Sequence, residues 1–475
     1  MAQELKPEIC VLGADAGGLS VAAAAAVFGV PTVLVEKGGW GGEFLKKSGS
    51  VPAQALIAAA DHANAVRNGA RLGTKAVRFG VDFGAVVAHM RDVIDAVAPN
   101  FARERFAGLG VRIIDGAARF TDADTVAVGD FAIKANRFVI ATGSSPLIPA
   151  IPGLLDTPHL TSETVADLAQ LPRHLIVIGA DAAGLELAQA FRRVGSEVTV
   201  LEAATPLARE DRECADVVLD ALEREGVKLR TGVEVTNVRR ALARVQVAFA
   251  TPAGAETIEG SHLLVASGRR PNLEGLDLDF AGIRHAADGI VVDEHLRTTN
   301  KRVFAVGDVT GAPPFAHVGT YHAGLVVRQV LLRLPVKVNH LAVPRVLHTD
   351  PELAHVGLTE EEARARNGAI RILRWPYREN DRAQAARTTN GHIKVVTDRK
   401  GDILGVTIVG AQAGETITTW TLAISEKLNI RAFGGLVVPY PSYAEVGKRA
   451  ATAYFTPGLT SSRVRRIIGW LRRLG

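Results

Sequence analysis

The chain reads ICVLGADAGGLSVAAAAAVFGVPTVLVEK from Ile9 to Lys37, and it reads LIVIGADAAGLELAQAFRRVGSEVTVLEA from Leu175 to Ala203. The two stretches align without a gap. Each stretch begins with an apolar run, which is followed by a glycine-rich turn, an Ala-rich helical pattern and a second apolar run ending in an acid. Each stretch therefore predicts a βαβ unit, and together they predict an α/β protein with two Rossmann-like domains.

The turn in each copy has the features of a dinucleotide site. Glycines close such a turn and let a pyrophosphate approach the amide groups at the helix N-terminus. The acid about 20 residues further on, here Glu36 and Glu202, accepts hydrogen bonds from a ribose. Two copies thus predict two dinucleotides. The middle glycine, however, is replaced by Asp15 in one copy and Asp181 in the other, and we expect these carboxylates to crowd and repel a phosphate.

Other landmarks lie between and after the two copies. A strand and a Pro-rich link, RFVIATGSSPLIPAIPGL, occupy residues 137–154, and VASGRRPN at 265–272 closes the second unit in a similar way. The segment KRVFAVGDVTG at 301–311 predicts another strand and turn, followed by a helix around 321–334. From about Val338 the pattern changes to alternating strands and amphipathic helices, which predicts a separate α+β domain.

Composition restricts the functional class. The chain has 475 residues, enough for about three domains, and its net charge of +5 is matched by five arginines without an acid in the last thirteen residues. Since the basic character belongs to this tail rather than to a folded face, we expect no nucleic-acid partner. The only cysteines are Cys10 and Cys214, so neither a disulfide framework nor a CxxC metal pair is expected.

The ends of the chain carry further information. The first residues, MAQELKPEIC, lack the pattern of a signal peptide, and no apolar run reaches the length of about 20 residues that spans a bilayer, so we expect a cytoplasmic protein. The last segment predicts an amphipathic helix that docks on the protein or contacts the inner face of the membrane peripherally. Its apolar face consists of Val464, Ile467, Ile468, Leu471 and Leu474.

With these landmarks in this order, the chain resembles the pyridine nucleotide-disulfide oxidoreductases, which include dihydrolipoamide dehydrogenase and mercuric reductase. The resemblance covers nearly the whole chain. It implies an FAD domain interrupted by an NAD(P) domain and followed by an interface domain that forms a homodimer. The implied segments are 1–150 and 271–338 for the FAD domain, 151–270 for the NAD(P) domain, 339–457 for the interface domain and 458–475 for a basic amphipathic tail.

The resemblance also assigns cofactor residues. The residues implied for FAD are Gly13, Asp15, Gly18, Glu36, Thr142, Gly143, Gly307 and Asp308. The residues implied for the nicotinamide cofactor are Gly179, Gly184, Glu186 and Glu202. An acid at position 202 favours NADH over NADPH, because it would repel the 2′-phosphate of NADPH.

The redox-active cysteine pair of the family is missing. Where the family reads GGxCLNxGCxPSKAL, this chain reads GGEFLKKSGSVPAQAL at 41–56, so Phe44 replaces the first cysteine and Ser50 aligns with the second. Neither side chain can exchange electrons as a dithiol does. Gln54 replaces the lysine that in the family pairs with the glutamate aligned to Glu186, which leaves Glu186 as an unpaired acid or a solvent-facing helix residue.

A second catalytic motif is also altered. The family's HxHPTxxE places a catalytic histidine beside the disulfide of the partner subunit, and here Tyr440 aligns with that histidine while Glu445 keeps its place. Tyrosine is a poor base at neutral pH but can donate a proton, so Tyr440 is either a donor or a packed interface aromatic. The remaining histidines occur singly, without metal-ligand spacing, and we expect no metal site.

Two functions are compatible with these features. In the first, NADH passes a hydride to FAD, and the reduced flavin passes electrons to a small-molecule acceptor other than a disulfide, such as a quinone that stacks on Phe44. Glu186, Tyr440 and Glu445 are its candidate catalytic residues. In the second, the chain is a non-catalytic descendant that acts as a dimeric scaffold or nucleotide-sensing partner. A disulfide reductase using Cys10 or Cys214 is disfavoured, because Cys10 lies in a predicted strand.

Overall fold

The computed structural model of the chain describes residues 3–42, 50–74, 79–242, 244–456 and 462–473. The chain divides into two compact units, each assembled from segments that are separate in the sequence. Both combine helices with sheets, which confirms the predicted α/β class. The first unit comprises Met1–Ala180, Ala190–Ala203 and Gly232–Val338, and the second comprises Asp181–Gln189, Ala204–Thr231 and Asn339–Gly475.

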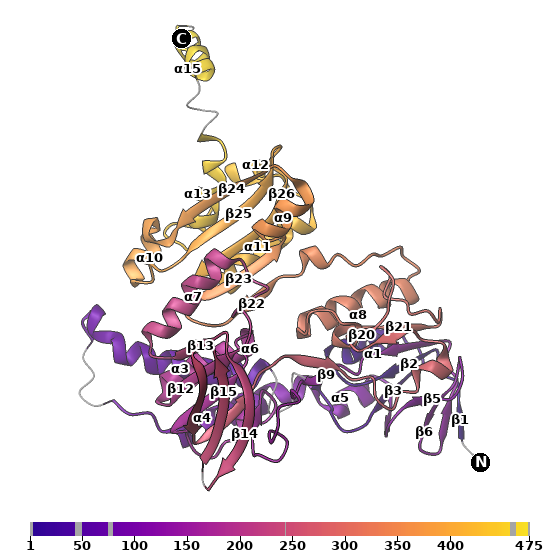
Figure 1. The fold of residues 1–475 in the computed structure, drawn as a ribbon. Coiled ribbons are helices and arrows are strands. Elements are labelled where there is room, and N and C mark those ends of the chain that lie inside the picture. The colour runs from indigo at the N-terminus through magenta and orange to yellow at the C-terminus, as the bar shows by residue number, and fades with distance from the viewer. Residues whose placement is uncertain (1–2, 43–49, 75–78, 243, 457–461, 474–475) are drawn as a thin grey trace. The chain divides into compact units, whose positions relative to one another are not determined.

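The first repeat forms the predicted βαβ unit within a five-stranded sheet of order β21-β8-β2-β3-β4 (Figure 1). All its strand pairs are parallel, and every side chain of β2 and β3 is buried, as expected for a sheet covered on both faces. The strands are β2 Ile9–Leu12, β3 Thr32–Glu36, β4 Arg112–Asp115, β8 Arg137–Ile140 and β21 Val303–Ala305.

Two helices of this unit approach each other closely, α1 (Ala16–Val27) and α8 (Ala316–Val330). A Cβ atom on Gly17 would lie only 3.1 Å from the carbonyl oxygen of Gly319, so glycine is what allows the two backbones to come together. Helix α8 begins before the predicted start at residue 321. The pair covers one face of the sheet through an apolar core that includes Leu19, Val306 and Val326.

The other face of this sheet packs on a smaller sheet through a second apolar core. The smaller sheet has the order β1-β7-β6-β5, and the remaining helices of the region follow β3 in the chain. These elements are β1 Gln3–Leu5, β5 Arg119–Phe120, β6 Val126–Val128, β7 Phe131–Ile133, α3 Ser50–Asn68, α4 Phe83–Val97 and α5 Arg103–Gly108.

The second repeat forms the other predicted βαβ unit. Strands β10, β17, β11 and β12 are parallel neighbours in that order, and an antiparallel sheet of order β14-β15-β16 shares an apolar core with them. The elements are β10 Leu160–Thr161, β11 His174–Ile178, α6 Ala182–Val194, β12 Glu197–Glu202, α7 Arg212–Arg224, β13 Lys228–Thr231, β14 Glu234–Ala241, β15 Arg244–Thr251, β16 Gly254–Gly260 and β17 His262–Val265. The first unit also contains two short antiparallel strand pairs. They are β9 Ser144–Pro146 with β18 Arg269–Pro271, and β19 His285–Ala286 with β20 Gly289–Ile290.

The C-terminal part of the second unit is an antiparallel sheet of order β22-β23-β26-β25-β24 (Figure 1). Helix α11 packs on β23 and β26, and α13 packs on β24 and β25. Its core contains Trp420 stacked on Phe433, with ring centroids 4.0 Å apart. The elements are β22 Arg345–Leu347, β23 Glu352–Gly357, α9 Glu360–Asn367, β24 Ile370–Pro376, α10 Asp381–Ala386, β25 His392–Asp398, β26 Ile403–Gly410, α11 Ala413–Ser425, α12 Arg431–Gly434, α13 Glu445–Ala453 and α15 Ser462–Leu471.

Candidate dinucleotide sites

The first glycine-rich turn is closed by contacts that only glycine allows. Gly13 follows β2 with a φ of 105°, and a Cβ atom there would lie 2.2 Å from the carbonyl oxygen of Ala141. A Cβ atom on Gly18 would lie 2.0 Å from the carbonyl oxygen of Gly13. The turn is therefore held tightly between the ends of β2 and β8 and the first turn of α1, as a pyrophosphate cradle requires.

Glu36, the acid at the end of β3, is bonded to the same turn. Its Oε2 accepts the Ala14 N–H at 2.7 Å, and its Oε1 accepts the N–H groups of Gly38 at 2.9 Å and Gly39 at 2.7 Å. A carboxylate offers about four lone-pair sites, so about one site of this buried group remains for a ribose hydroxyl. The residue predicted to bind the ribose thus also fixes the backbone of the turn and of the segment that follows β3.

The Thr142–Gly143 segment is clamped by a residue that the sequence did not single out. The Asn272 side chain donates from Nδ2 to the carbonyl of Thr142 at 2.9 Å, and the Thr142 hydroxyl donates to the carbonyl of Asn272 at 2.8 Å. The Asn272 N–H also donates to the carbonyl of Gly143 at 3.0 Å. The signal was present in VASGRRPN, whose last residue is Asn272, although the role of that residue was not predicted.

Asp308 lies in the turn after β21 and is the centre of a buried polar group. The Ser144 hydroxyl donates to its Oδ2 at 2.5 Å and accepts from Nε of Arg269 at 2.7 Å. The Gly307 N–H donates to Nδ1 of the buried His322 at 3.2 Å, which holds the same turn from the α8 side. Burial, together with the charge of Asp15, raises the pKa of Asp308 to about 6, although the bond from Ser144 opposes the shift. Ser144, Arg269 and His322 were not predicted as part of this site.

The Asp15 carboxylate lies inside this cluster. A Cβ atom on Gly42 would lie 2.0 Å from its Oδ1, and one on Gly143 would lie 2.7 Å from its Oδ2. The carboxylate therefore packs directly against both glycines. As the N-cap residue of α1, Asp15 makes no side-chain hydrogen bond to the first amide groups of the helix. The backbone cradle, Glu36 and the Asp308 turn fit FAD, and Asp15 is a carboxylate that a bound pyrophosphate would meet.

The second turn repeats this backbone geometry. Gly179 has a φ of 107°, and a Cβ atom there would lie 2.3 Å from the carbonyl oxygen of Ala266. Oε2 of Glu202 accepts the Ala180 N–H at 2.7 Å. A Cβ atom on Gly268, the counterpart of Gly143, would meet nothing within 4 Å. Asp181 is exposed and Gly184 is buried in α6. The second turn fits a nicotinamide dinucleotide, and the space beside Gly268 is open.

Glu186 was expected either to lack an ion-pair partner or to face solvent, and the structure shows a backbone hydrogen bond that neither alternative included. Glu186 is half-buried in α6, and its Oε1 accepts the backbone N–H of His348 at 2.7 Å. On the next turn of the helix, Gln189 Oε1 accepts the N–H of Asp350 at 2.8 Å. Burial raises the pKa of Glu186 to about 7, opposed by the bond from His348. The acid has a backbone partner, and it titrates near neutrality.

Tyr440 and Glu445 are not bonded to each other within one chain. Tyr440 is 70% exposed, and its hydroxyl donates to Oδ2 of Asp381 at 2.9 Å, which raises the pKa of Tyr440. Oε2 of Glu445 is buried without a hydrogen-bond partner among the described residues. Of the two positions aligned with the cysteine pair, Phe44 lies outside the described residues, and Ser50 is the exposed first residue of α3.

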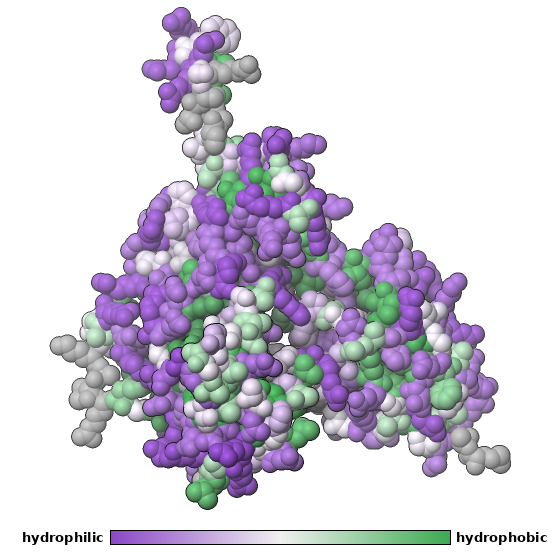
Figure 2. Space-filling view, in the orientation of Figure 1, coloured by the Kyte–Doolittle hydropathy of each residue, from purple (hydrophilic) through white to green (hydrophobic). Residues whose placement is uncertain are grey.

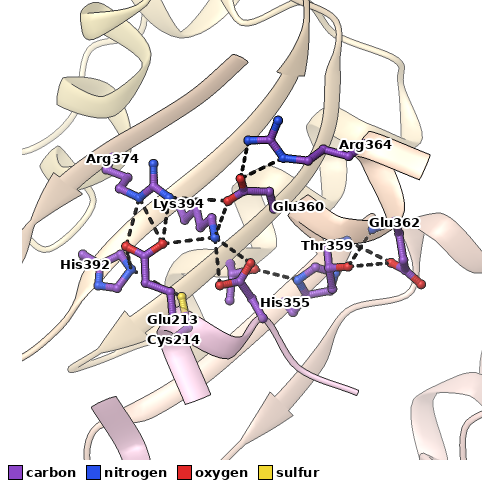
Figure 3. A network of polar contacts seen from close by, with 12 residues as sticks. Glu213, Cys214, His355, Thr359, Glu360, Glu362, Arg364, Arg374, His392 and Lys394 are labelled. Carbon is purple, nitrogen blue, oxygen red and sulfur yellow. Dashed lines mark hydrogen bonds and ion pairs between the residues drawn. The ribbon is translucent and has the colours of Figure 1, made fainter. Parts of the chain in front are cut away.

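Both thiols of the chain are free and buried. Cys10 lies in β2 and Cys214 in α7, and burial raises the pKa of each. Cys214 lies 3.5 Å from Nε2 of His392, next to an ion-pair cluster in which Lys394 contacts several carboxylates (Figure 3). The carboxylates around Cys214 disfavour a thiolate there, so neither position suits a reactive cysteine.

The described residues contain no group of three His, Cys, Asp or Glu side chains placed to hold a metal ion. Within the same residues, no helix combines the length and apolar character needed to cross a bilayer.

Comparisons with known proteins agree over most of the chain. The sequence model of the pyridine nucleotide-disulphide oxidoreductases matches residues 7–323, and that of their dimerisation domain matches residues 343–451. The chain is 33% identical over 455 residues to a mercuric reductase of Streptomyces lividans, covering 94% of this chain and 96% of the relative. It is 31% identical over 455 residues to a dihydrolipoyl dehydrogenase of Geobacillus stearothermophilus, with the same coverage of 94% and 96%.

Solved structures show the same likeness. The Cu(II) complex of RclA, an HOCl-induced flavoprotein disulfide reductase from Escherichia coli, superposes with a TM-score of 0.83 at 26% identity. The match covers 94% of this chain and 99% of that one. These matches agree with the two glycine turns and the Asp308 cluster. The chain belongs to the pyridine nucleotide-disulfide oxidoreductase family.

Proposed function

We propose that this flavoprotein oxidoreductase transfers a hydride from NADH to FAD and passes the electrons to a small-molecule acceptor other than a disulfide. Two observations together support the proposal, the geometry of the dinucleotide turns and the burial of both cysteines. Both dinucleotide turns keep the backbone geometry of binding sites, whereas the two cysteines of the chain are buried in a strand and a helix. A dithiol relay would need a thiolate within reach of both the flavin and the substrate.

The proposed FAD site consists of the first turn, Glu36, the Thr142–Gly143 segment and Asp308. When bound, FAD supplies a group that accepts a hydride and releases electrons to a second substrate. The turn would hold the pyrophosphate on the amide groups of α1, and Glu36 would hold the adenine ribose. Asp308, whose carboxylate accepts a hydrogen bond from Ser144, would lie beside the part of FAD that links the flavin ring to the pyrophosphate.

The proposed nicotinamide site is the second turn, and we propose NADH as its ligand. Glu202 accepts the Ala180 N–H and is only half-buried, and it holds the position of the acid that meets a ribose in such a unit. A 2′-phosphate at that place would meet a carboxylate, which disfavours NADPH. Replacing Glu202 by Ala should raise the relative efficiency with NADPH.

Three residues are proposed to take part in proton transfer or acceptor contact. Glu186, with its pKa near 7, can exchange a proton at neutral pH from a fixed position. Tyr440 is exposed, and its single hydroxyl proton is donated to Asp381, so it would donate to a ligand or to a second subunit by exchanging that bond. Glu445 is the third of these residues, and its Oε2 is buried without a hydrogen-bond partner among the described residues.

The acceptor we favour is a quinone. A quinone takes up electrons from a reduced flavin directly, without a thiol. Mercuric ion is a poor candidate, because it is a soft metal that thiolates bind, and both thiols here are buried. The dimerisation domain at residues 343–451 supports a homodimer. Because a lipid-soluble quinone lies in the membrane, we propose a cytoplasmic protein that reaches the inner face of the membrane.

The test is turnover without cysteines. The purified protein should be yellow, and the double variant Cys10→Ser, Cys214→Ser should oxidise NADH with a soluble quinone or dichlorophenolindophenol at the rate of the unaltered chain. Because both cysteines are buried, the thermal unfolding of the variant serves as a control for folding. A folded, flavin-containing variant that has lost all NADH oxidation would contradict the proposal.

One observation favours the second candidate function, a non-catalytic dimer that acts as a scaffold or nucleotide sensor. The Asp15 carboxylate packs against Gly42 and Gly143, where a bound pyrophosphate would meet it. A protein that cannot be reconstituted with FAD, and that dimerises without consuming NADH, would favour this function over the oxidoreductase.

A further inference from the structure

The C-terminal helix α15 exposes large apolar side chains. Ile467, Ile468, Trp470 and Leu471 are 50%, 48%, 61% and 51% exposed. Ile467, Ile468 and Leu471 share one face of the helix, because residues three and four apart lie side by side. A soluble helix of this length normally buries such a face. Here more than a third of each side chain remains open to solvent.

The polar side of the same helix is uniformly basic. Arg465, Arg466, Arg472 and Arg473 are all exposed, and the last thirteen residues contain five arginines and no acid. No ion pair of these four arginines occurs among the described residues. In Figure 2, hydrophilic side chains predominate on the visible face of α15. The helix therefore combines an open apolar face with unneutralised positive charge.

We propose that α15 binds an anionic lipid surface, lying in the interface with its apolar face toward the acyl chains. Lipid headgroups carry the negative charge that the arginines lack in the chain, and the acyl region accepts Ile467, Ile468 and Leu471. Trp470 suits the boundary, where its ring is apolar and its N–H remains hydrated. A nucleic acid would neutralise the arginines but leave the apolar face uncovered. This inference does not depend on the identity of the electron acceptor.

The test uses the full chain and vesicles of phosphatidylcholine, prepared with and without phosphatidylglycerol. We expect co-sedimentation with the anionic vesicles, little with the neutral ones, and weakening by salt, which screens charge. The double variant Ile467→Asp, Leu471→Asp should reduce binding about tenfold or more, because it removes apolar burial. Leu242→Asp is the matched control, since Leu242 is 95% exposed in another part of the chain and its replacement should leave binding unchanged.

A second readout reports on the helix itself. Trp470 emission, obtained as the difference between the unaltered chain and Trp470→Phe, should shift to shorter wavelength on anionic vesicles. Because α15 is exposed, its variants should keep the unfolding temperature of the unaltered chain. Three results would overturn the proposal. They are no binding to anionic vesicles at low salt, equal binding to neutral vesicles, and unchanged binding in the Ile467→Asp, Leu471→Asp variant.

Discussion

The two βαβ units have nearly the same backbone and different surroundings. Gly13 and Gly179 have φ angles of 105° and 107°, and each lies against the carbonyl that ends a neighbouring strand. Glu36 and Glu202 each accept a turn N–H at 2.7 Å. The space beside Gly143 is filled by Asp15, however, whereas the space beside Gly268 is open.

A repeated turn therefore does not imply a repeated binding site. Backbone contacts fix the turn in both copies, so both keep the geometry for a pyrophosphate. The surroundings then decide how a phosphate would be received. In the first copy the Asp15 carboxylate stands among Gly42, Gly143 and the acid Asp308, while in the second copy Asp181 is exposed to solvent.

The largest effect should come from Gly13→Ala. The new Cβ atom would overlap the Ala141 carbonyl, and the positive φ is unfavourable for alanine, so we expect a loss of about 2–4 kcal/mol of stability and of bound flavin. Gly179→Ala should cost a similar amount but retain flavin and lose NADH oxidation. Gly324→Ala, with nothing within 4 Å of its Cβ, is the control and should be neutral or slightly stabilising. Chemical denaturation and flavin absorbance measure both properties.

Replacing the ribose acids by their amides should separate the copies further. In Glu36→Gln, an amide NH₂ would face backbone N–H groups that the carboxylate now accepts, costing about 1–3 kcal/mol and weakening FAD binding. Glu202→Gln should cost about 1 kcal/mol or less, because Glu202 is only half-buried, and should raise the KM for NADH. Equal losses of stability in both variants would show that the surroundings of the two acids do not differ in effect.

The third prediction concerns the carboxylate itself. Asp15→Gly should tighten FAD binding on the order of tenfold, or about 1.4 kcal/mol, because it removes a like charge beside the pyrophosphate. Since Asp15 makes no cap hydrogen bond, α1 should not be weakened. Asp15→Asn separates charge from volume, and Asp181→Gly should change NADH affinity little. Fluorescence titration of the apoprotein with FAD would contradict the account if Asp15→Gly bound more weakly.

The smallest effect should be on pH dependence. The pKa of Asp308, raised by burial from 3.8 to about 6, lies above its unfolded value, so this group favours the folded state below about pH 4 and loses that contribution as the pH rises to about 6. Ionisation adds negative charge near the pyrophosphate, and FAD affinity should fall about threefold from about pH 5 to about pH 7. Asp308→Asn should abolish the inflection, and NADH affinity should show none there.

Much of this arrangement could be predicted from the sequence, because it depends on local patterns. Two apolar runs around a glycine turn specify each βαβ unit, and the acids Glu36 and Glu202 follow at a fixed spacing. The pair of Asp308 with Ser144, the clamp of Asn272 on Thr142 and the bond of Glu186 to His348 join residues far apart in the chain. The hydrophobic periodicity of the sequence does not predict such contacts, because they depend on the order of the strands in the sheets.

The same limit applies to Asp15. Its identity predicted repulsion of a phosphate, and only the fold shows that Gly42 and Gly143 surround its carboxylate. Tyr440 is a similar case. The alignment placed it at a catalytic histidine, while its partner, Asp381, lies in α10 and could not be found from spacing. Glycine contacts and side-chain pairs across a fold are properties of packing rather than of pattern.

The most direct test of the central claim, electron transfer from NADH to flavin without a dithiol, is an anaerobic titration of the purified protein with NADH, followed at the flavin absorption band. A flavin without a redox-active disulfide takes up a single electron pair. We therefore expect complete bleaching with about one NADH per bound flavin, and the same result in the variant Cys10→Ser, Cys214→Ser. A requirement for about two NADH per flavin, or a flavin that NADH does not bleach, would contradict it.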